Sequence, residues 1–149
     1  MIEAATDRDL PQVHSLLERF HLPLEGLDDH LETMLVARDG SRVVGTAALE
    51  VYPDAALLRS VAVDAGQQGR HLGHQLTEAA LRLAEEHGAE AVFLLTTTAE
   101  RFFPKFGFEP IARDAVPASV RASVEFTSAC PASAIVMRKR LTHPEPSTS

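Results

Sequence analysis

Residues 61 to 73 read Val61-Ala62-Val63-Asp64-Ala65-Gly66-Gln67-Gln68-Gly69-Arg70-His71-Leu72-Gly73. The apolar start of this stretch predicts the end of a β-strand, its glycines predict a loop, and its last residues open an amphipathic helix. Such a loop presents backbone N–H groups and the positive end of a helix dipole, which together favour a phosphate. The glycines let a ligand approach closely because they carry no Cβ atom. The stretch therefore predicts a phosphate-binding loop between a strand and a helix.

The composition is typical of one globular domain. The chain has 149 residues, of which 45% are hydrophobic and 23% are charged, and this balance is enough to bury a full core. The formal net charge of −7 argues against nucleic acid or an anionic membrane as the main partner. An anionic small ligand stays open, provided that local donors overcome the overall repulsion.

The sequence also indicates the compartment. Cys130 is the only cysteine, so no intramolecular disulfide can form. The start of the chain lacks the charged and apolar regions of a signal peptide. No apolar run approaches the ~20 residues that a membrane-spanning helix needs. We therefore expect a cytoplasmic protein.

The rest of the chain predicts strands and helices in alternation around the central stretch. The predicted strands cover residues 1–5, 35–38, 42–51, 55–63, 92–95, 108–113 and 134–141. The predicted helices cover residues 6–19, 24–34, 72–87 and a short segment from 97 to 107, and a helical turn is expected at 116–120. This order predicts an α/β or α+β fold in which helices lie against a mixed sheet.

Two motifs in this order carry a family resemblance. The first is Leu58-Arg59-Ser60-Val61-Ala62-Val63 followed by Gln68-Gly69-Arg70-His71-Leu72-Gly73, and the second is Ala99-Glu100-Arg101-Phe102-Phe103-Pro104-Lys105-Phe106-Gly107-Phe108. Together they resemble the GCN5-related N-acetyltransferase (GNAT) superfamily over nearly the whole chain. The resemblance implies a mixed, mostly antiparallel sheet flanked by helices, with a V-shaped splay between the fourth and fifth strands. It also implies one acetyltransferase domain over residues 1–141, followed by a disordered tail at 142–149.

The resemblance implies acetyl-CoA as the cofactor. The family's loop has the pattern Gln/Arg-x-x-Gly-x-Gly/Ala, in which Gln68 takes the first position and Gly73 the last. His71 replaces the middle glycine, and its side chain would either crowd the pyrophosphate or add a donor to it. The cofactor-binding residues implied by the family are Val61, Ala62, Val63, Gln68, Gly69, Arg70, His71, Leu72, Gly73 and Phe103.

The second motif departs from the family at one position. Many members read Phe-Tyr-x-x-x-Gly-Phe there, and the tyrosine is the proposed general acid that protonates the departing thiolate. This chain has Phe103 at that position, and a phenyl ring cannot donate a proton. A coenzyme A thiol is acidic enough that water can protonate its thiolate. The departure therefore leaves the general acid unassigned but does not exclude the reaction.

A third segment resembles one subgroup of the family. The runs Val116-Pro117-Ala118-Ser119-Val120 and 123–134 look like the acetyltransferases found with arsenic-resistance genes. Related enzymes acetylate the amino group of glutamate mimics that carry an arsinic or phosphinic acid. The resemblance therefore implies a small amino acid analogue, such as arsinothricin or phosphinothricin, as the acceptor.

Two carboxylates are candidate catalytic groups, because acetyl transfer to an amine needs a neutral nitrogen and a place for its proton. Glu50 lies on the strand beside the expected cofactor strand and can act as the base, directly or through water. Glu125 can act as the base or bind the substrate ammonium. The alternative for Glu50 is a solvated carboxylate at a strand end, and the alternative for Glu125 is a loop charge.

Three polar residues are candidate substrate ligands. Arg59 lies in an otherwise apolar strand and needs an anionic partner, since burying a guanidinium unpaired is costly. That partner is either a substrate carboxylate or arsinate, which suits a bidentate fork, or an internal carboxylate such as Glu50. Arg121 has the same chemistry, with a surface role as its alternative. Ser128 can donate to a substrate, with a turn as its alternative.

Other chemistries have weaker support in the sequence. Cys130 lacks a neighbouring histidine, so we expect a bystander thiol rather than a ping-pong nucleophile. His71 and His74 lack a third ligand at suitable spacing, so we expect no metal. The competing functions are a non-catalytic acyl-CoA-binding protein and a protein N-terminal acetyltransferase. A homodimer is a further expectation from the family.

Overall fold

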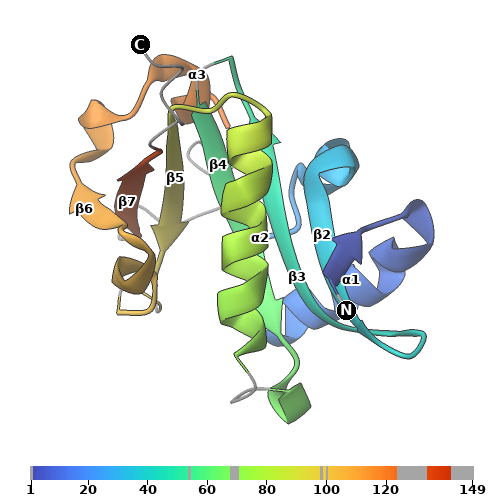
Figure 1. Ribbon diagram of the computed structural model, residues 1–149. Helices are drawn as coiled ribbons and strands as arrows, with labels where there is room; N and C mark the ends of the chain where they lie inside the picture. The colour runs from blue at the N-terminus through green and yellow to red at the C-terminus, as the bar shows by residue number, and fades with distance from the viewer. Residues whose placement is uncertain are drawn as a thin grey trace.

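The computed structural model describes residues 2–53, 55–67, 71–97, 99, 101–123 and 134–141. These residues form a seven-stranded sheet with the strand order β1-β2-β3-β4-β5-β7-β6 (Figure 1). The strands are β1 (Ile2–Ala4), β2 (Met34–Asp39), β3 (Arg42–Val51), β4 (Ala55–Val63), β5 (Ala91–Thr96), β6 (Glu109–Ile111) and β7 (Ile135–Arg140). Neighbouring strands are antiparallel except for β4 and β5, which are parallel. The predicted mixed, mostly antiparallel sheet is confirmed.

Helices cover both faces of this sheet (Figure 1). The α-helices are α1 (Leu10–Arg19), α2 (Leu72–Glu86) and α3 (Ala118–Arg121). Leu58 and Leu49 pack in the same cluster as α2, whereas Leu57 packs with α3 and Ala48 packs with α1. Because consecutive strand residues point to opposite faces, α2 covers one face and α1 and α3 cover the other. No helix in the described part of the chain is both long and apolar enough to cross a membrane.

Two predicted helices differ from the structure. The helix expected at residues 24–34 is a 3₁₀ segment at Leu27–Thr33 that breaks at His30, where φ is −117° and ψ is 28°. This segment buries only Leu27 and Thr33, which is too little apolar surface to hold a regular α-helix. In the described part of residues 97–107 the helical segment is one 3₁₀ turn at Phe103–Phe106, because Pro104 lacks the N–H that a helix continuing from residue 97 would need there.

A charged network fastens α1 to the edge of the sheet. Arg38 of β2 donates to both carboxylate oxygens of Asp9, at 2.6 and 2.7 Å, and to Glu3 of β1 at 2.6 Å. The hydrogen bonds from Arg38 outweigh burial and hold the pKa of Asp9 below its ordinary value.

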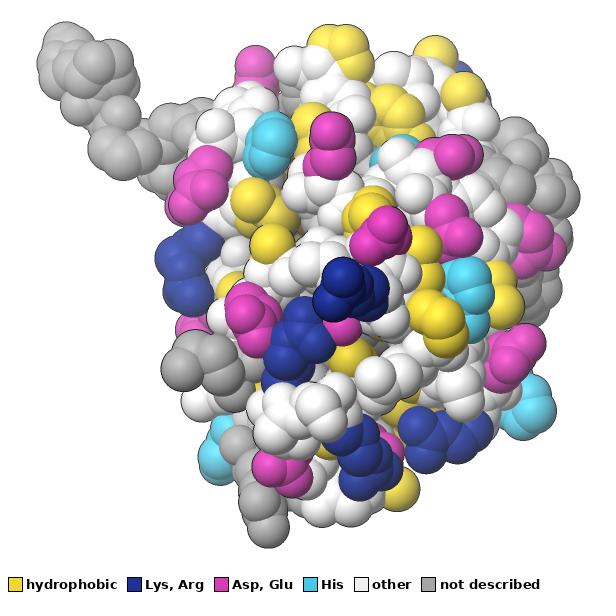
Figure 2. Space-filling model, turned by 90° about the vertical axis from the view of Figure 1, so that its right-hand side faces the viewer, with side chains coloured by type: hydrophobic (Ala, Val, Ile, Leu, Met, Phe, Trp, Pro, Cys, Tyr) yellow, Lys and Arg dark blue, Asp and Glu magenta, His cyan; other side chains and the backbone are white. Residues whose placement is uncertain are grey.

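Figure 2, which views the side that α1 and β1 occupy in Figure 1, shows basic and acidic side chains interspersed. The net negative charge is therefore not gathered as one acidic patch on this face.

β4 and β5 separate soon after they begin. Their parallel pairing joins Ala55–Leu57 to Ala91–Phe93. Further along, β4 carries an extra residue relative to β3, because Ala48 pairs with Arg59 while Thr46 pairs with Ala62. Such a bulge bends a strand and increases its twist. The predicted splay between the fourth and fifth strands is confirmed, and it opens a cleft at the ends of the two strands.

Candidate active site

A groove connects the N-terminus of α2 to the splay between β4 and β5. It consists of two clefts, of about 270 and 400 Å³, that share Val63, Gly73 and Phe102 as lining residues. The smaller cleft lies at the start of α2 and the larger one lies between the diverging strands. The end formed by α2 contains Gln67, His71, His74 and Lys105 and is called the polar end below. The other end is lined mostly by aliphatic and aromatic residues and is called the apolar end.

The polar end is built on the first turn of α2. His71 is the residue that precedes the helix, and its side chain makes no capping hydrogen bond. Without such a cap, the first N–H groups of the helix are available to a ligand, and the helix dipole favours an anion there. His74 and Lys105 line the same cleft. Backbone donors, imidazoles and one ammonium group together suit a phosphate.

Gly73 brings the backbone close to the walls of the groove. A Cβ atom placed on Gly73 would lie 3.6 Å from Cγ2 of Val63 and 3.7 Å from Cζ of Phe102. A larger side chain at this position would therefore extend into the groove that these three residues share. The role of Gly73 as a cofactor-binding residue stays a prediction. The expected ligands Gln68, Gly69 and Arg70 lie outside the described residues.

His71 adopts a backbone conformation that favours glycine. Its φ is 61°, in the left-handed region. This conformation costs an L-residue roughly 1–2 kcal/mol because the Cβ atom approaches the carbonyl oxygen. The conformation explains why the family pattern has glycine where this chain has histidine. His71 lines the smaller cleft, at the polar end of the groove.

Replacing His71 by glycine should raise the free energy of unfolding by about 1 kcal/mol, since glycine adopts the left-handed conformation without steric strain. Urea denaturation of the two proteins measures the difference. Gln75→Gly is the control, because Gln75 is exposed within α2, where glycine should lower stability by about 1 kcal/mol. A loss of stability in both variants would contradict the strain at His71.

Asp64 holds the start of the loop in place. Its carboxylate accepts hydrogen bonds from the backbone N–H of Gly66 at 3.0 Å and from Arg42 at 2.5 Å, and Arg19 lies 3.5 Å away. The hydrogen bond from Gly66, with Arg42 and Arg19 nearby, holds the pKa of Asp64 below its ordinary value. The loop is therefore tied to β3 and to the end of α1. The sequence analysis missed this residue, although an aspartate two residues before a glycine is a turn signal.

The larger cleft is lined by the diverging strands and by aromatic side chains. Its lining residues are Phe20, Leu22, Leu58, Arg59, Ser60, Val61, Ala62, Val63, Gly73, Leu94, Leu95, Thr96, Ala99, Phe102 and Phe103. The structure thus brings most of the described residues predicted for the cofactor to one cleft. Phe103 is 6% exposed and meets the rings of Phe102 and Phe108 edge-on. It serves both as core and as cleft wall.

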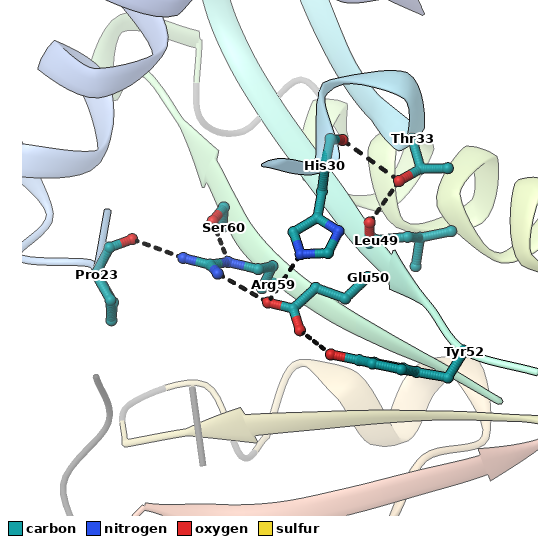
Figure 3. A network of polar contacts seen from close by, with 8 residues as sticks. All are labelled: Pro23, His30, Thr33, Leu49, Glu50, Tyr52, Arg59 and Ser60. Atoms are coloured by element: carbon teal, nitrogen blue, oxygen red, sulfur yellow. Dashed lines mark hydrogen bonds and ion pairs between the residues drawn. The ribbon is translucent and has the colours of Figure 1, made fainter. Parts of the chain in front are cut away.

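A buried ion pair lies beside the larger cleft (Figure 3). Nη1 of Arg59 donates to Oε2 of Glu50 at 2.9 Å, and the two side chains are 0% and 2% exposed. Glu50 is thus the partner of Arg59, which is the internal alternative that the sequence left open. Arg59 also lines the cleft, and its role as a substrate ligand stays a prediction.

Other contacts of the ion pair join three parts of the chain. Arg59 donates through Nη2 to the carbonyl oxygen of Pro23 at 3.2 Å and through Nε to Oγ of Ser60 at 3.2 Å. Tyr52 donates to Oε1 of Glu50 at 2.5 Å, and Nε2 of His30 lies 3.8 Å from Oε2 (Figure 3). The network therefore links the segment after α1 to β3 and to the bulge in β4.

The surroundings of Glu50 favour its ionised form. Burial alone would raise the pKa of Glu50, but hydrogen bonds from Ser123, Tyr52 and Arg59 outweigh it and hold the pKa below its ordinary value. A carboxylate of this kind is a weak proton acceptor. The role of Glu50 as the base stays a prediction that this geometry does not favour. A structural role within the network fits its contacts better.

Tyr52 should titrate far above a free tyrosine. Burial, and then the hydrogen bond to the Glu50 carboxylate, raises the pKa of Tyr52 to about 12. The chain has one tyrosine and no tryptophan, so the near-ultraviolet absorbance band of a phenolate reports Tyr52 alone. We expect phenolate absorbance of the folded protein only as the pH approaches about 12. Glu50→Gln should move the midpoint toward the ordinary value of about 10. A midpoint near 10 in the folded wild-type protein would contradict the contact.

Some predicted site residues are not brought to the groove. Arg121 is exposed at the end of α3 and does not line either cleft. Glu125, Ser128 and Cys130 lie outside the described residues, so their roles stay predictions. The described ranges contain no group of three or more His, Cys, Asp or Glu side chains that could hold a metal ion.

Comparisons with known proteins match this fold and groove. The family described as Acetyltransferase (GNAT) domain matches residues 30–110. An amino-acid acetyltransferase from Mycobacterium tuberculosis is 38% identical over 80 residues, which cover 53% of this chain and 45% of the relative. This chain therefore spans less than half of the length of that relative.

Two solved structures show the same fold. Rv2747 from Mycobacterium tuberculosis, in complex with CoA and a second ligand, has a TM-score of 0.81 at 26% identity, covering 95% of this chain and 99% of that one. N-acetylglutamate synthase from Neisseria gonorrhoeae, complexed with coenzyme A and N-acetyl-glutamate, has a TM-score of 0.82 at 22% identity, covering 96% of this chain and 35% of that one.

The comparisons correct the subgroup and establish the family. The named relatives are amino-acid acetyltransferases and not members of the arsenic-resistance subgroup that the C-terminal run resembles. The family match covers more than half of the chain, and it includes β3, β4, α2 and β5 with the splay between the parallel strands. The chain therefore belongs to the GNAT acetyltransferase family.

Proposed function

We propose that this chain is an acetyl-CoA-dependent N-acetyltransferase that acts on the amine of a small amino acid in a ternary complex. One observation carries the proposal, namely the groove that joins the first turn of α2 to the splay between β4 and β5. Membership of the family supports the reaction class. The structural relatives that hold coenzyme A support the cofactor.

The residues along the groove fit acetyl-CoA. The first N–H groups of α2, with His71 and Lys105, would hold the phosphates. Val61 and Val63 of β4 would lie along the pantetheine arm. When bound, acetyl-CoA supplies its acetyl group as a thioester, so that a nitrogen–carbon bond replaces the carbon–sulfur bond, one proton leaves the nitrogen and one reaches the sulfur.

The apolar end of the groove would receive the amine. Phe20 and Leu22, from the segment after α1, form part of the wall of the larger cleft, together with Leu95 of β5. Apolar walls disfavour a charged ammonium, so they would lower the pKa of the amine and favour the neutral nucleophile. The pairing of Arg59 with Glu50 adds no net charge at this end. These residues therefore bind and desolvate the amine rather than deprotonate it.

The class of acceptor follows from the relatives. The curated relative is an amino-acid acetyltransferase, and one structural relative is an N-acetylglutamate synthase. Glutamate is therefore the first acceptor to test. Phosphinothricin and arsinothricin are glutamate analogues and belong in the same panel.

The test is turnover with acetyl-CoA and a panel of amines. Free thiol is followed with acetyl-CoA alone and then with each amino acid, with the two analogues and with a peptide that has a free N-terminus. We expect thiol release that depends on one amino acid. Binding of acetyl-CoA in a calorimeter without thiol release for any amine would contradict the enzyme and favour a non-catalytic acyl-CoA-binding protein. Release that requires the peptide would favour a protein N-terminal acetyltransferase.

A further inference from the structure

We propose that the hydroxyl of Ser60 donates a hydrogen bond to the sulfur of the departing coenzyme A, in place of the hydroxyl that the chain lacks at Phe103. The inference rests on the proposed function, since it concerns the same groove. The sulfur takes its final proton from water, so the serine keeps its own proton and acts only as a hydrogen-bond donor. Three observations about Ser60 support this role.

The first observation is the backbone of Ser60. Its φ is 60°, in the left-handed region that L-residues rarely adopt. It lies within the bulge of β4, between Arg59, which pairs with Ala48, and Ala62, which pairs with Thr46. Bulges redirect side chains, and strained residues that the surrounding structure maintains cluster at functional sites. The strand therefore holds a serine where glycine would be easier to accommodate.

The second observation is the way in which the hydroxyl is held. Nε of Arg59 donates to Oγ of Ser60 at 3.2 Å (Figure 3). Arg59 is itself fixed by Glu50 at 2.9 Å and by the carbonyl oxygen of Pro23 at 3.2 Å. A hydroxyl that accepts a hydrogen bond still has its own proton to donate, and a charged donor polarises it. The network therefore orients Ser60 and strengthens it as a donor.

The third observation is the position of Ser60 in the cleft. Ser60 and Phe103 line the same cleft of about 400 Å³, Ser60 from β4 and Phe103 from the turn after β5. Phe103 has no group that can stabilise a thiolate. A hydroxyl from β4 would act where negative charge develops, in a cleft with largely apolar walls. A single donor directed at such charge typically contributes about 100-fold in rate.

Two replacements of Ser60 separate the hydroxyl from the backbone. Ser60→Ala removes the donor and keeps a Cβ atom, and Ser60→Gly removes the donor and relieves the left-handed conformation. We expect both variants to lose about 100-fold in kcat, with the Kd for coenzyme A within about twofold of wild type. A purely structural role predicts that Ser60→Gly keeps its activity. Ser15→Ala, on the exposed face of α1, is the matched control and should behave as wild type.

A second readout does not depend on turnover. Ultraviolet titration of the coenzyme A complex, from which the titration of the protein alone is subtracted, measures the pKa of the bound thiol. A donor at Ser60 stabilises the thiolate, so this pKa should be about one unit lower in the wild-type complex than in the complex with Ser60→Ala. Equal values in the two complexes would overturn the proposal.

The outcomes also separate this inference from the proposed function. Turnover by wild type together with retained turnover by Ser60→Gly would overturn the role of Ser60 alone. If the Ser60 variants lose coenzyme A affinity in the same proportion as kcat, the role of Ser60 would also be overturned. The replacements would then have disturbed the cofactor groove rather than removed a donor to the sulfur. No turnover by wild type with any amine would overturn the proposed function, and this inference with it.

Discussion

Replacing Arg59 by methionine should lower the free energy of unfolding by about 4 kcal/mol, because it leaves the buried Glu50 carboxylate without its guanidinium partner. Both side chains are almost fully buried, and their atoms lie 2.9 Å apart. The same change removes the donor to the carbonyl oxygen of Pro23, at 3.2 Å. Urea denaturation at neutral pH, with far-ultraviolet circular dichroism as the probe, measures the loss.

The double variant Arg59→Met with Glu50→Gln is the matched control. It removes both charges while keeping similar side-chain volumes, and replacing both partners of a buried pair is often nearly neutral. We therefore expect the double variant to be more stable than Arg59→Met alone. Equal or lower stability of the double variant would contradict the coupling between the two side chains.

The pH dependence of this loss has a defined sign. In the wild-type protein the pKa of Glu50 is held below its ordinary value of 4.5. The stabilisation that ionised Glu50 gives to the folded protein is therefore fully present above a pH of about 4.5 and is lost as the pH falls through the lower pKa of the folded state. Without Arg59 the pKa of Glu50 rises relative to wild type, because burial remains while the hydrogen bond and the positive charge of Arg59 are lost, so the variant has less of this stabilisation to lose in acid. The difference in the free energy of unfolding between wild type and Arg59→Met should be largest near neutral pH and should narrow below a pH of about 4.

Replacing Gly73 by glutamate should weaken acetyl-CoA binding by about 100-fold or more. The new side chain would enter the groove between Val63 and Phe102, and its charge would oppose the phosphates at the start of α2. Like charges brought together cost several kcal/mol, and each 1.4 kcal/mol is about tenfold in affinity. Isothermal calorimetry with acetyl-CoA measures the change.

Gln75→Glu is the control for this experiment. It adds the same charge two residues further along α2, at an exposed position that lines neither cleft of the groove. An acidic residue near a helix N-terminus is stabilising, so neither variant should unfold for electrostatic reasons. Binding should stay within a few-fold of wild type in Gln75→Glu. Similar losses in both variants would show that overall charge, and not the groove, determines the affinity.

The fold was predictable where local patterns are strong. The apolar face of α2 and the glycine at residue 88, whose φ is 79°, gave both ends of that helix to within one residue. The strands from residue 34 to residue 63 followed from alternation and turn residues. The segment at 27–33 was predicted as a helix and is a broken 3₁₀ segment, because its conformation depends on packing against β3 rather than on its own periodicity.

The site was predictable only in part, for a physical reason. An arginine in an apolar strand requires an anion, so the pairing of Arg59 with Glu50 was among the alternatives from the start. Tyr52 lies two residues after Glu50 and Ser60 lies next to Arg59, so both contacts are local in sequence, although neither residue was predicted to join the pair. Lys105 lies at the polar end of the groove only because a turn of 3₁₀ helix follows β5. This placement depends on tertiary structure.

Mass spectrometry of the products after incubation with isotopically labelled acetyl-CoA and glutamate or its analogues shows which molecule receives the acetyl group. The groove and the family predict an N-acetylated amino acid that carries the label, formed in equal amount with free coenzyme A. Release of coenzyme A with the label recovered as free acetate, or no release with any amine, would contradict the proposed transfer to an amine.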